Sequence, residues 1–559
     1  MNIFKLMKTF GKLLNEEIIR SMNWKSRILQ ILVYSLLIGA CASETNTDKP
    51  NFVIILMDDM GYSDIGCYGS EIPTPNIDNL AANGIRFSQF YNTSRCCPTR
   101  ASLLTGLYQH QAGMGMMTGK NPDRETNPAY QGYLNENCQT IAEVLKTGGY
   151  NTYMTGKWHV GSKKKEWWPM QRGFDKFYGL THGASNFFRP APKNGFMLGN
   201  DTLQIPKDTG YYTTDAFTDY AIKFIEEQDN DNPFFCYLAY TAPHWPLHAK
   251  ENDIRKFLGS YMIGWDSLRA QRWQKQLEQG IVDEKWGLSP RDSVLRAWNE
   301  LTDSQKIDLD TRMAIYAAMI YRADANIGRL VDKLKELGKF ENTLIMFLSD
   351  NGACPEPWND ITPNGRSEFG KGTLKHMYNR QKVGQITYGQ GWANAGNTPF
   401  RRYKTQSHEG GISTPFIAHW PKGIKGKPGS IVHTPGHIID IMATLVELSG
   451  TDYPIEVNGN KIHPMAGVSL TPAFNGEIES LHDWLFWEHR LEGAARHGDY
   501  KVVFRENTNE WYLYNIAEDR NELNNLANEM PEKLEFMKEK WIAWAKTNGV
   551  LPKKGIDIQ

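Results

Sequence analysis

Two pairs of adjacent polar residues have the chemistry of a metal site. Asp58 and Asp59 follow one apolar run, and Asp350 and Asn351 follow another run much later in the chain. Together they offer hard oxygen ligands, which favour Ca²⁺ or Mg²⁺ over zinc. A single Asp pair after a strand is more often a turn or a helix N-cap. Two such pairs after two apolar runs favour a site for one divalent cation.

The segment from Cys96 to Gly106 (CCPTRASLLTG) has residues that could hold an oxyanion. Pro98 suits the first position of a helix and Gly106 suits its end, which places Cys96 near a helix N-terminus. Free N–H groups there favour anions, and the Arg100 guanidinium can bind the same anion through two hydrogen bonds. The alternative is two buried cysteines beside a helix cap. A cysteine phosphatase is excluded, because it needs five residues between its Cys and Arg, and only three separate Cys96 from Arg100.

The elements that must position these residues alternate along the chain. Continuous apolar runs of strand length indicate buried, mostly parallel strands at residues 51–57, 233–240 and 342–348. Helical patterns occur at residues 140–148, 213–228 and 308–337. This alternation predicts an α/β fold with a doubly wound sheet, in which ligands lie at the carboxyl ends of the strands. Polar residues just after strands, such as His244, are therefore where we expect chemistry.

The pattern changes after about residue 478. Short aromatic strands are expected at residues 484–489, 500–504 and 510–514, followed by a helix at residues 531–547. We therefore expect a catalytic domain over residues 50–477 and a small C-terminal α+β subdomain over residues 478–559, packed on the larger one.

Composition excludes several classes of protein. Of 559 residues, 40% are hydrophobic and 22% are charged, which fits neither a disordered chain nor a polytopic membrane protein. The 62 Lys and Arg residues balance 63 Asp and Glu residues, so no strongly basic surface for nucleic acid is expected. Seven cysteines in so long a chain do not indicate a disulfide scaffold, and none has the spacing of a structural zinc site.

The residue pattern at the N-terminus is typical of a targeting segment. Lys25 and Arg27 precede an apolar run at residues 28–38, which is too short to span a bilayer but suits a signal peptide. The small residues before Cys41 resemble a bacterial lipobox, so we expect residues 1–40 to be removed, Cys41 to carry lipid and residues 41–49 to act as a linker. An ordinary signal peptide is the alternative, and Met22 is a more natural start than Met1.

The chemistry-bearing segment resembles the signature of type I sulfatases, the arylsulfatase family of the alkaline phosphatase superfamily. The resemblance rests on Cys-x-Pro-x-Arg at Cys96–Arg100 and on further motifs that occur in the family's order. These are residues 58–64 (DDMGYSD), 74–78 (TPNID), 156–159 (GKWH), 173–179 (GFDKFYG), 243–244 (PH), 350–352 (DNG), 404–411 (KTQSHEGG), 498–501 (GDYK) and 511–515 (WYLYN). The resemblance covers about residues 50–548. Thr99 is the one small departure, since serine is commoner there.

The resemblance implies an alkaline-phosphatase-like fold and a role for each matched residue. Cys96 would be converted to formylglycine by a maturation enzyme and hydrated to a diol that attacks the sulfur of a sulfate ester. One divalent cation, Ca²⁺ or alternatively Mg²⁺, would be held by Asp58, Asp59, Cys96, Asp350 and Asn351. The other implied roles belong to Arg100 (orienting the diol), Lys157 and Lys404 (sulfate oxygens), His244 (proton donor to the leaving alcohol), Asp350 (deprotonating the nucleophile) and His159 (base for sulfate release).

Substrate contacts are harder to assign. His489 and Arg490 open the C-terminal domain, which often overhangs the pocket in this family, although a surface or interdomain role is as plausible. Asn186 and Phe188 could line the pocket. The long basic loop at residues 353–397 could form a substrate wall or a solvated insertion.

The sequence thus predicts an exported enzyme, periplasmic or on the cell surface and bound to membrane only by lipid. Its expected substrates are sulfate monoesters of carbohydrates, such as galactose or N-acetylhexosamine sulfates, and also aryl sulfates, because residues 388–395 and 401–404 resemble the bacterial arylsulfatase branch. A formylglycine-dependent phosphonate monoester or phosphodiester hydrolase is the first alternative, because sulfate and phosphate are isosteric. An inactive sulfoglycan-binding surface protein is the second.

Overall fold

The computed structural model describes residues 49–118, 126–205, 210–356, 386–477, 480–490, 492–552, 556 and 558. The expected signal segment, Cys41 and most of the expected linker lie outside these residues, as do residues 357–385 of the long loop. The chain divides into two units, Met1–Asp48 and Lys49–Gln559, and the description below concerns the second. The boundary expected near residue 478 remains a prediction.

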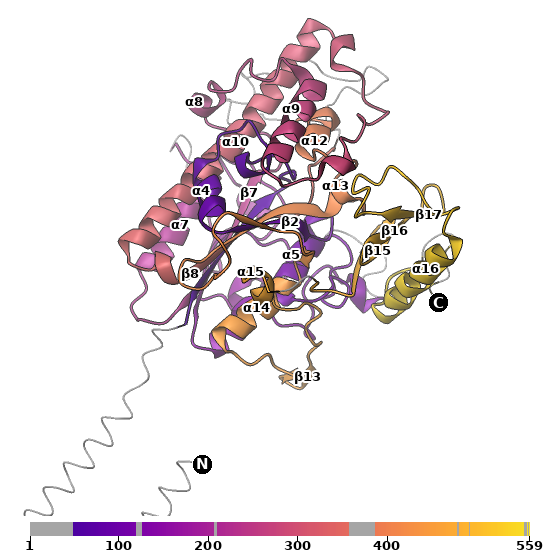
Figure 1. Ribbon diagram of the computed structural model, residues 1–559. Helices are drawn as coiled ribbons and strands as arrows, with labels where there is room; N and C mark the ends of the chain where they lie inside the picture. Colours follow the sequence, from indigo (N-terminus) through magenta and orange to yellow (C-terminus); the bar gives the residue numbers. More distant parts are fainter. Residues whose placement is uncertain are drawn as a thin grey trace, which may run out of the picture. The chain divides into compact units, whose positions relative to one another are not determined.

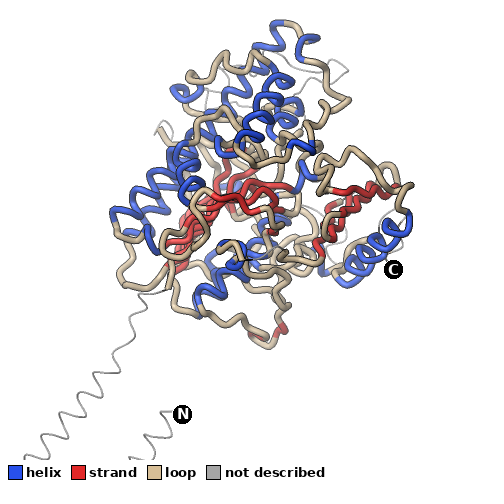
Figure 2. The backbone as a smooth tube through the Cα atoms, viewed as in Figure 1, coloured by secondary structure: helices blue, strands red, loops and turns tan. Residues whose placement is uncertain are grey.

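A large mixed sheet runs through the middle of the molecule (Figures 1 and 2). Its strand order is β10-β2-β9-β8-β1-β7-β3-β4-β5-β6, with β11 paired to β2. The strands are β1 (Asn51–Asp58), β2 (Ile85–Tyr91), β3 (Asn151–Lys157), β4 (Lys176–Leu180), β5 (Phe196–Leu198), β6 (Asp201–Thr202), β7 (Phe234–Pro243), β8 (Thr343–Ser349), β9 (Ser413–His419), β10 (Ser430–Val432) and β11 (Gly436–His437).

The centre of this sheet is parallel, as the apolar runs predict. Strand β1 pairs in parallel with β7 on one side and β8 on the other, and β3 pairs in parallel with β7. Alternate side chains of β1 enter two different cores, with Val53 and Ile55 on one face and Phe52 and Ile54 on the other. Because both faces are covered, the strand has no polar face, which explains its continuous apolar sequence.

Helices cover both faces of the sheet (Figure 1). One face packs against α4 (Pro75–Asn83), α7 (Thr213–Glu226), α8 (Glu251–Ile254), α9 (Gly264–Glu278) and α10 (Asp303–Glu336). The other face packs against α5 (Cys96–Thr105), α6 (Ile141–Thr147), α14 (Asp440–Ser449) and α15 (Thr471–Phe474). The expected helices at residues 140–148, 213–228 and 308–337 are confirmed as α6, α7 and α10. Two short helices, α12 (Gln390–Gly396) and α13 (Glu409–Ile412), precede β9.

Helix α5 differs in one detail from the prediction. It begins at Cys96, with Arg95 as its N-cap, so Pro98 occupies the third helical position and not the first. The first four N–H groups of a helix have no intrahelical partner, so Pro98 removes no helical hydrogen bond there. The shift moves Cys96 to the first residue of the helix. Gly106 ends the helix in the left-handed conformation, with φ 68°, as expected.

The C-terminal part forms a separate four-stranded antiparallel sheet backed by one helix (Figure 2). Its elements are β14 (Trp484–His489), β15 (Glu492–His497), β16 (Tyr500–Arg505), β17 (Glu510–Asn515) and α16 (Pro531–Thr547). The sequence analysis missed β15, whose Gly-Ala-Ala-Arg segment lacks the aromatic and β-branched residues typical of strands. A two-stranded ladder, β12 (Glu456–Val457) with β13 (Asn460–Lys461), precedes this sheet.

The cysteines agree with the expectation of no disulfide scaffold. The six cysteines within the described residues are all free and buried. Among the described helices, none is long and apolar enough to cross a membrane.

Candidate active site

Strand register brings the predicted site residues to one edge of the sheet. Asp58, at the end of β1, lies opposite Pro243 of β7, and Met57 lies opposite Ser349 of β8. His244 and Asp350 directly follow these partners, so three residues distant in sequence meet at the carboxyl ends of adjacent parallel strands. Lys157 ends the neighbouring strand β3.

The backbone around this edge adopts unusual conformations. Positive φ angles occur at Asp59 (67°), Ser94 (64°), His159 (58°) and Thr405 (77°). Residues other than glycine rarely adopt this backbone conformation. Asp59 and His159 are themselves predicted site residues, and Thr405 adjoins Lys404. Such conformations persist only where surrounding structure holds them, and they cluster at functional sites.

Three cationic side chains pair with three carboxylates in the buried cluster. Lys157 Nζ lies 2.7 Å from Asp58 Oδ2, and Arg100 Nη2 lies 2.7 Å from Asp350 Oδ2. Lys404 Nζ donates to Asp59 Oδ1 at 2.5 Å. Every one of these side chains is at least 98% buried. Buried charges are retained only when they are paired or bind an ion, so the cluster is a site of strong local field.

Burial opposes the ionisation of two of the three carboxylates. Burial, followed by the nearby Asp58 carboxylate, raises the pKa of Asp350 to about 8. Burial likewise raises the pKa of Asp58, against the opposing effect of Lys157 and Arg100. For Asp59, burial is outweighed by Lys404 and His244, which hold its pKa below the usual range. A further positive charge close to Asp58 and Asp350 would therefore favour their ionised forms.

The donor set fits a hard divalent cation. Asn351 Nδ2 donates to Asp59 Oδ1 at 2.7 Å and to the Gly352 carbonyl at 2.9 Å, which fixes the orientation of the amide. Asn351 Oδ1 and Asp59 Oδ2 are then buried without a hydrogen-bond partner. A buried oxygen without a partner is costly, and a cation would satisfy both. Asp58, Asp59 and His244 also bring one ligand atom each within 4.8 Å of one another.

Cys96 and His159 form the second half of the cluster. Ligand atoms of Cys96, Cys97 and His159 lie within 4.8 Å of one another. A hydrogen bond from Cys97, with Lys157 and Lys404 nearby, outweighs burial and holds the pKa of Cys96 well below its usual range. Burial lowers the pKa of His159 to about 4, so its imidazole is neutral at pH 7 and can accept a proton.

His244 stands on the other side of Asp59. Its Nε2 lies 3.5 Å from Asp59 Oδ2, and its Nδ1 contacts the Trp245 carbonyl oxygen at 2.5 Å. Burial lowers the pKa of His244 to about 4. The contact with Trp245 fixes the ring, so that Nε2 is the nitrogen that faces the cluster.

The structure thus brings the predicted catalytic and metal residues together. The predicted substrate residues Asn186, His489 and Arg490 lie in the following surroundings. Asn186 Oδ1 accepts the N–H groups of Phe188 and Arg189, so this side chain caps a turn. His489 is completely buried at the end of β14, and Arg490 is exposed at the following hairpin turn. Their contact with substrate remains a prediction.

Gly183 is a site residue that the sequence analysis missed. A methyl group at this position would lie 2.4 Å from Cε1 of His159, so the imidazole ring needs the space that glycine leaves. No sequence signal marks this glycine, because the contact joins a loop to the end of β3 and depends on tertiary structure.

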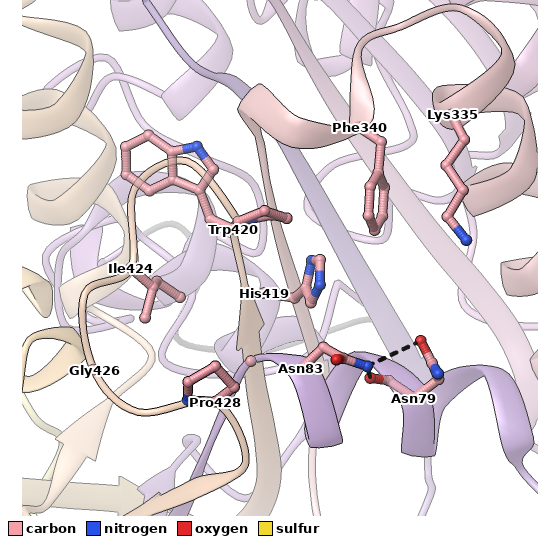
Figure 3. A pocket seen from close by; sticks show the side chains of 11 residues that line it. Asn79, Asn83, Lys335, Phe340, His419, Trp420, Ile424, Gly426 and Pro428 are labelled. Carbon is pink, nitrogen blue, oxygen red and sulfur yellow. Dashed lines mark hydrogen bonds between the residues drawn. The ribbon is translucent and has the colours of Figure 1, made fainter.

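A pocket of about 350 Å³, whose lining side chains Figure 3 shows, lies at the other end of the sheet from this cluster. Because β9 runs antiparallel to β8, its last residue, His419, lies at the amino end of the parallel strands. Trp420, Phe340 and Lys335 are among the lining residues, and none of the predicted catalytic residues lines this pocket. The buried cluster of Asp58, Asp59 and Asp350 and this pocket are therefore separate.

Two family models match the chain. The model described as Sulfatase matches residues 50–451, which include the whole cluster. The model described as N-sulphoglucosamine sulphohydrolase, C-terminal, matches residues 402–542, which include the C-terminal sheet.

Named relatives and a solved structure agree with these matches. An arylsulfatase of Klebsiella aerogenes is 35% identical over 449 residues, covering 78% of this chain and 94% of the relative. An N-acetylgalactosamine-6-sulfatase of Sus scrofa is 27% identical, covering 83% of this chain and 73% of the relative. The crystal structure of Ps i-CgsB in complex with k-i-k-neocarrahexaose superposes with a TM-score of 0.63 at 26% identity, covering 90% of this chain and 94% of that one.

Proposed function

Since the chain belongs to the sulfatase family and is a sulfuric ester hydrolase, we propose that it desulfates carbohydrates through a formylglycine formed at Cys96. The family, the arylsulfatase relative and the alkaline-phosphatase-like fold establish the reaction class. For the sugar, the support is one relative named N-acetylgalactosamine-6-sulfatase and one neighbour solved in complex with k-i-k-neocarrahexaose. Galactose or N-acetylhexosamine sulfates are therefore the proposed substrates.

One observation carries the mechanism. Cys96 is the first residue of α5, it lies beside the neutral base His159, and the cations Lys157 and Lys404 act on its charge. A group that develops negative charge at this position is stabilised by preorganised donors and cations, which is the main requirement for attack on a sulfate ester.

In the proposed first step, a hydroxyl of the hydrated formylglycine attacks sulfur. The Asp350 carboxylate accepts the proton of the attacking hydroxyl, and the new O–S bond forms as the bond between sulfur and the alcohol oxygen breaks. His244 supplies the proton for the leaving alcohol from Nε2, whose protonated form is favoured by the Asp59 carboxylate 3.5 Å away and by the negative charge of bound sulfate. Lys157 and Lys404 offset the charge on the sulfate oxygens, and Arg100 orients the nucleophile through its position beside Asp350.

In the second step, His159 removes the proton from the remaining hydroxyl. The electron pair of the broken O–H bond re-forms the aldehyde carbonyl, the C–O bond to sulfate breaks, and inorganic sulfate leaves. A serine at this position has a single hydroxyl and would remain sulfated, which is why we propose a diol and not a simple alcohol. Each turnover returns the aldehyde, which water hydrates again.

Asp58, Asp59, Asp350 and Asn351 would hold the divalent cation, for which we propose Ca²⁺, with Mg²⁺ as the alternative. The cation would lower the pKa of the nucleophilic hydroxyl and neutralise sulfate charge. Its support is the pair of unpartnered buried oxygens on Asp59 and Asn351.

The test is sulfate release by protein co-expressed with a maturation enzyme, across sulfated monosaccharides, an aryl sulfate and a phosphate diester analogue. We expect sulfate release, its loss in Cys96→Ala, and formylglycine at position 96 by mass spectrometry. Faster hydrolysis of the phosphate diester would instead favour a phosphonate monoester or phosphodiester hydrolase. An unmodified Cys96 with binding but no turnover would indicate an inactive sulfoglycan-binding protein.

We also propose that the protein is exported and held at the membrane by lipid on Cys41, in the periplasm or at the cell surface. The support is the basic and apolar pattern that precedes Cys41. We expect Cys41→Ser to move the protein from the membrane fraction to the soluble fraction. An unlipidated Cys41 in the mass spectrum of the native protein would contradict the proposal.

A further inference from the structure

A carboxylate, a guanidinium and an indole meet beside the catalytic cluster. Glu356 Oε1 lies 3.0 Å from Arg95 Nη1, and Glu356 Oε2 accepts from Trp245 Nε1 at 2.8 Å. Arg95 immediately precedes Cys96, and Trp245 immediately follows His244. The three side chains, which we call the rim triad, therefore touch the segments that carry the nucleophile and the proton donor.

The rim triad is more open to solvent than the cluster behind it. The side chains of Glu356 and Arg95 are 22% and 14% exposed, whereas those of Asp58, Asp350, Arg100 and Lys157 are completely buried. A substrate that reaches the cluster from solvent can therefore contact Glu356 with the part of the molecule that stays outside the sulfate site.

Charge restricts what Glu356 can bind. A carboxylate next to an anionic substrate is unfavourable by itself, but the Arg95 pair leaves no net charge at this position. The pair also disfavours an ammonium group, because Arg95 would repel it. What remains is the hydrogen-bonding capacity of the carboxylate, which has about four acceptor positions, of which Arg95 and Trp245 occupy two.

Glu356 is an acceptor only. Burial raises its pKa, but Lys404 and Arg95 outweigh burial and hold the pKa below the usual range, so the carboxylate is ionised at neutral pH. An ionised carboxylate can satisfy a hydroxyl of the substrate but not a carbonyl or ether oxygen. Arg95 Nε, which is buried without a hydrogen-bond partner, adds a donor to the same place.

We propose that the rim triad is the leaving-group subsite and that Glu356 accepts a hydrogen bond from a ring hydroxyl of the departing sugar. This inference rests on the proposed function and deepens it: the preferred substrates are sulfate esters of hydroxyl-bearing sugars, and aryl sulfates use the site without this contact. Trp245 holds the carboxylate in place through its indole N–H.

The test compares Glu356→Gln with wild type, both metal-loaded and carrying formylglycine, on 4-nitrophenyl sulfate and on monosulfated galactose and N-acetylgalactosamine. A hydrogen bond to a charged acceptor is worth about tenfold to a hundredfold in binding. We therefore expect kcat/KM on the best sugar sulfate to fall about tenfold to a hundredfold more than kcat/KM on 4-nitrophenyl sulfate. Trp245→Phe should give the same pattern with a smaller loss.

Deoxy analogues of that sugar sulfate identify the hydroxyl. Wild type should discriminate against one analogue by about tenfold or more, and Glu356→Gln should lose this discrimination. The matched control is Glu143→Gln, because Glu143 makes a 3.0 Å ion pair with Arg172 at similar burial, 19% and 10% exposed, away from the cluster. It should not change the ratio of the two substrates.

Equal losses on the aryl and the sugar sulfate would overturn the inference, since they would mean that Glu356 only positions Arg95 and the nucleophile. A wild-type enzyme that hydrolyses the aryl sulfate but none of the sugar sulfates would overturn it as well. Failure of wild type on every sulfate ester would instead contradict the proposed function, so the two failures are distinguishable.

Discussion

At the scale of residues, the site works by pairing every buried charge while leaving a few atoms unsatisfied. Lys157, Lys404 and Arg100 each have a carboxylate partner. Among the predicted metal and catalytic residues, Asp59 Oδ2, Asn351 Oδ1 and His159 Nδ1 are buried without a hydrogen-bond partner. Since these atoms lie in one cluster with paired charges, a bound cation or substrate could satisfy them.

The role of His159 predicts a specific failure in His159→Ala. Attack on sulfur does not need this base, so the first turnover should release alcohol, and the enzyme should then remain sulfated. Steady-state turnover should fall by about a hundredfold to ten-thousandfold. The measurements are the alcohol burst and the intact mass of the protein after it. Steady turnover without sulfated enzyme would contradict the assignment, and Cys96→Ala, which should give no burst, is the control.

The same residue sets a limit at low pH. The pKa of His159 is about 4, so the ring is neutral above this value and protonated below it. We expect the release of sulfate to slow as the pH falls through about 4, while the burst of alcohol is retained. Pre-steady-state rates measured between pH 3 and pH 6 check this, and a release step that does not depend on pH in this range would exclude His159 as the base.

Removal of the divalent cation should affect stability as well as activity. Burial raises the pKa values of Asp58 and Asp350, and a neighbouring carboxylate (Asp59 and Asp58, respectively) raises them further, so a bound cation would favour the ionised forms. We expect a chelator to lower Tm by several degrees and to abolish sulfate release, and Ca²⁺ to restore both. Calorimetric titration of the stripped protein with Ca²⁺ and Mg²⁺ would identify the ion. An unchanged Tm and no heat of binding would argue against a cation here.

At the scale of elements, the turn after β3 and the loop around Gly183 must fit together to hold the imidazole. A Cβ at position 183 would lie 2.4 Å from Cε1 and 2.5 Å from Nε2 of His159. We expect Gly183→Ala to lower kcat by about tenfold or more by displacing the ring, because a misplaced catalytic group loses much of its effect.

A double-mutant cycle makes this prediction specific. If Gly183→Ala acts through His159, its effect should disappear when it is combined with His159→Ala. The double variant should then turn over at the rate of His159→Ala alone. Additive losses would show that Gly183 acts on another part of the site.

At the scale of the whole molecule, a buried ion network joins the large sheet to the C-terminal sheet. Glu409 of α13 contacts Lys501 of β16 and Arg520 at 2.9 Å each, and Lys501 also contacts Glu522 at 2.9 Å. All four side chains are completely buried. Because Glu409 lies five residues after Lys404, this network also anchors the segment that carries this proposed sulfate-binding lysine.

This network predicts sensitivity to acid. Burial raises the pKa of Glu409, but Lys501 and then Arg520 outweigh burial and hold it at about 2, below its ordinary value of 4.5. The carboxylate therefore contributes stability above pH 4.5, and this contribution is lost as the pH falls towards 2. We expect Glu409→Gln to lower the free energy of unfolding by about 3–5 kcal/mol at pH 7 and to flatten its dependence on pH in that window.

Denaturant unfolding at several pH values measures both effects. The control is Glu251→Gln, because Glu251 pairs with Arg255 on the surface and exposed pairs contribute less than about 1 kcal/mol. Equal destabilisation by the two substitutions would contradict the role given to the network.

The sequence by itself determined the chemistry and the central elements. The runs at residues 51–57, 233–240 and 342–348 are apolar throughout because both faces of β1, β7 and β8 are covered. These strands can therefore be recognised from the sequence alone. The motif at Cys96–Arg100 and the Asp pairs predicted the proposed nucleophile and metal ligands, since the family motif and the Asp pairs are local in the sequence. The sequence analysis missed strand β15 because its small residues are not typical of strands.

Only the tertiary structure decided what depends on contacts between distant segments. The space that Gly183 leaves for His159, the meeting of Glu356 with Arg95 and Trp245, and the network around Glu409 each join residues far apart in the chain. Asn186 likewise turned out to cap a turn, because its hydrogen bonds depend on the loop conformation. Spacing in a sequence encodes local periodicity, whereas these contacts arise from the register of the sheet and from the packing of loops at its edge.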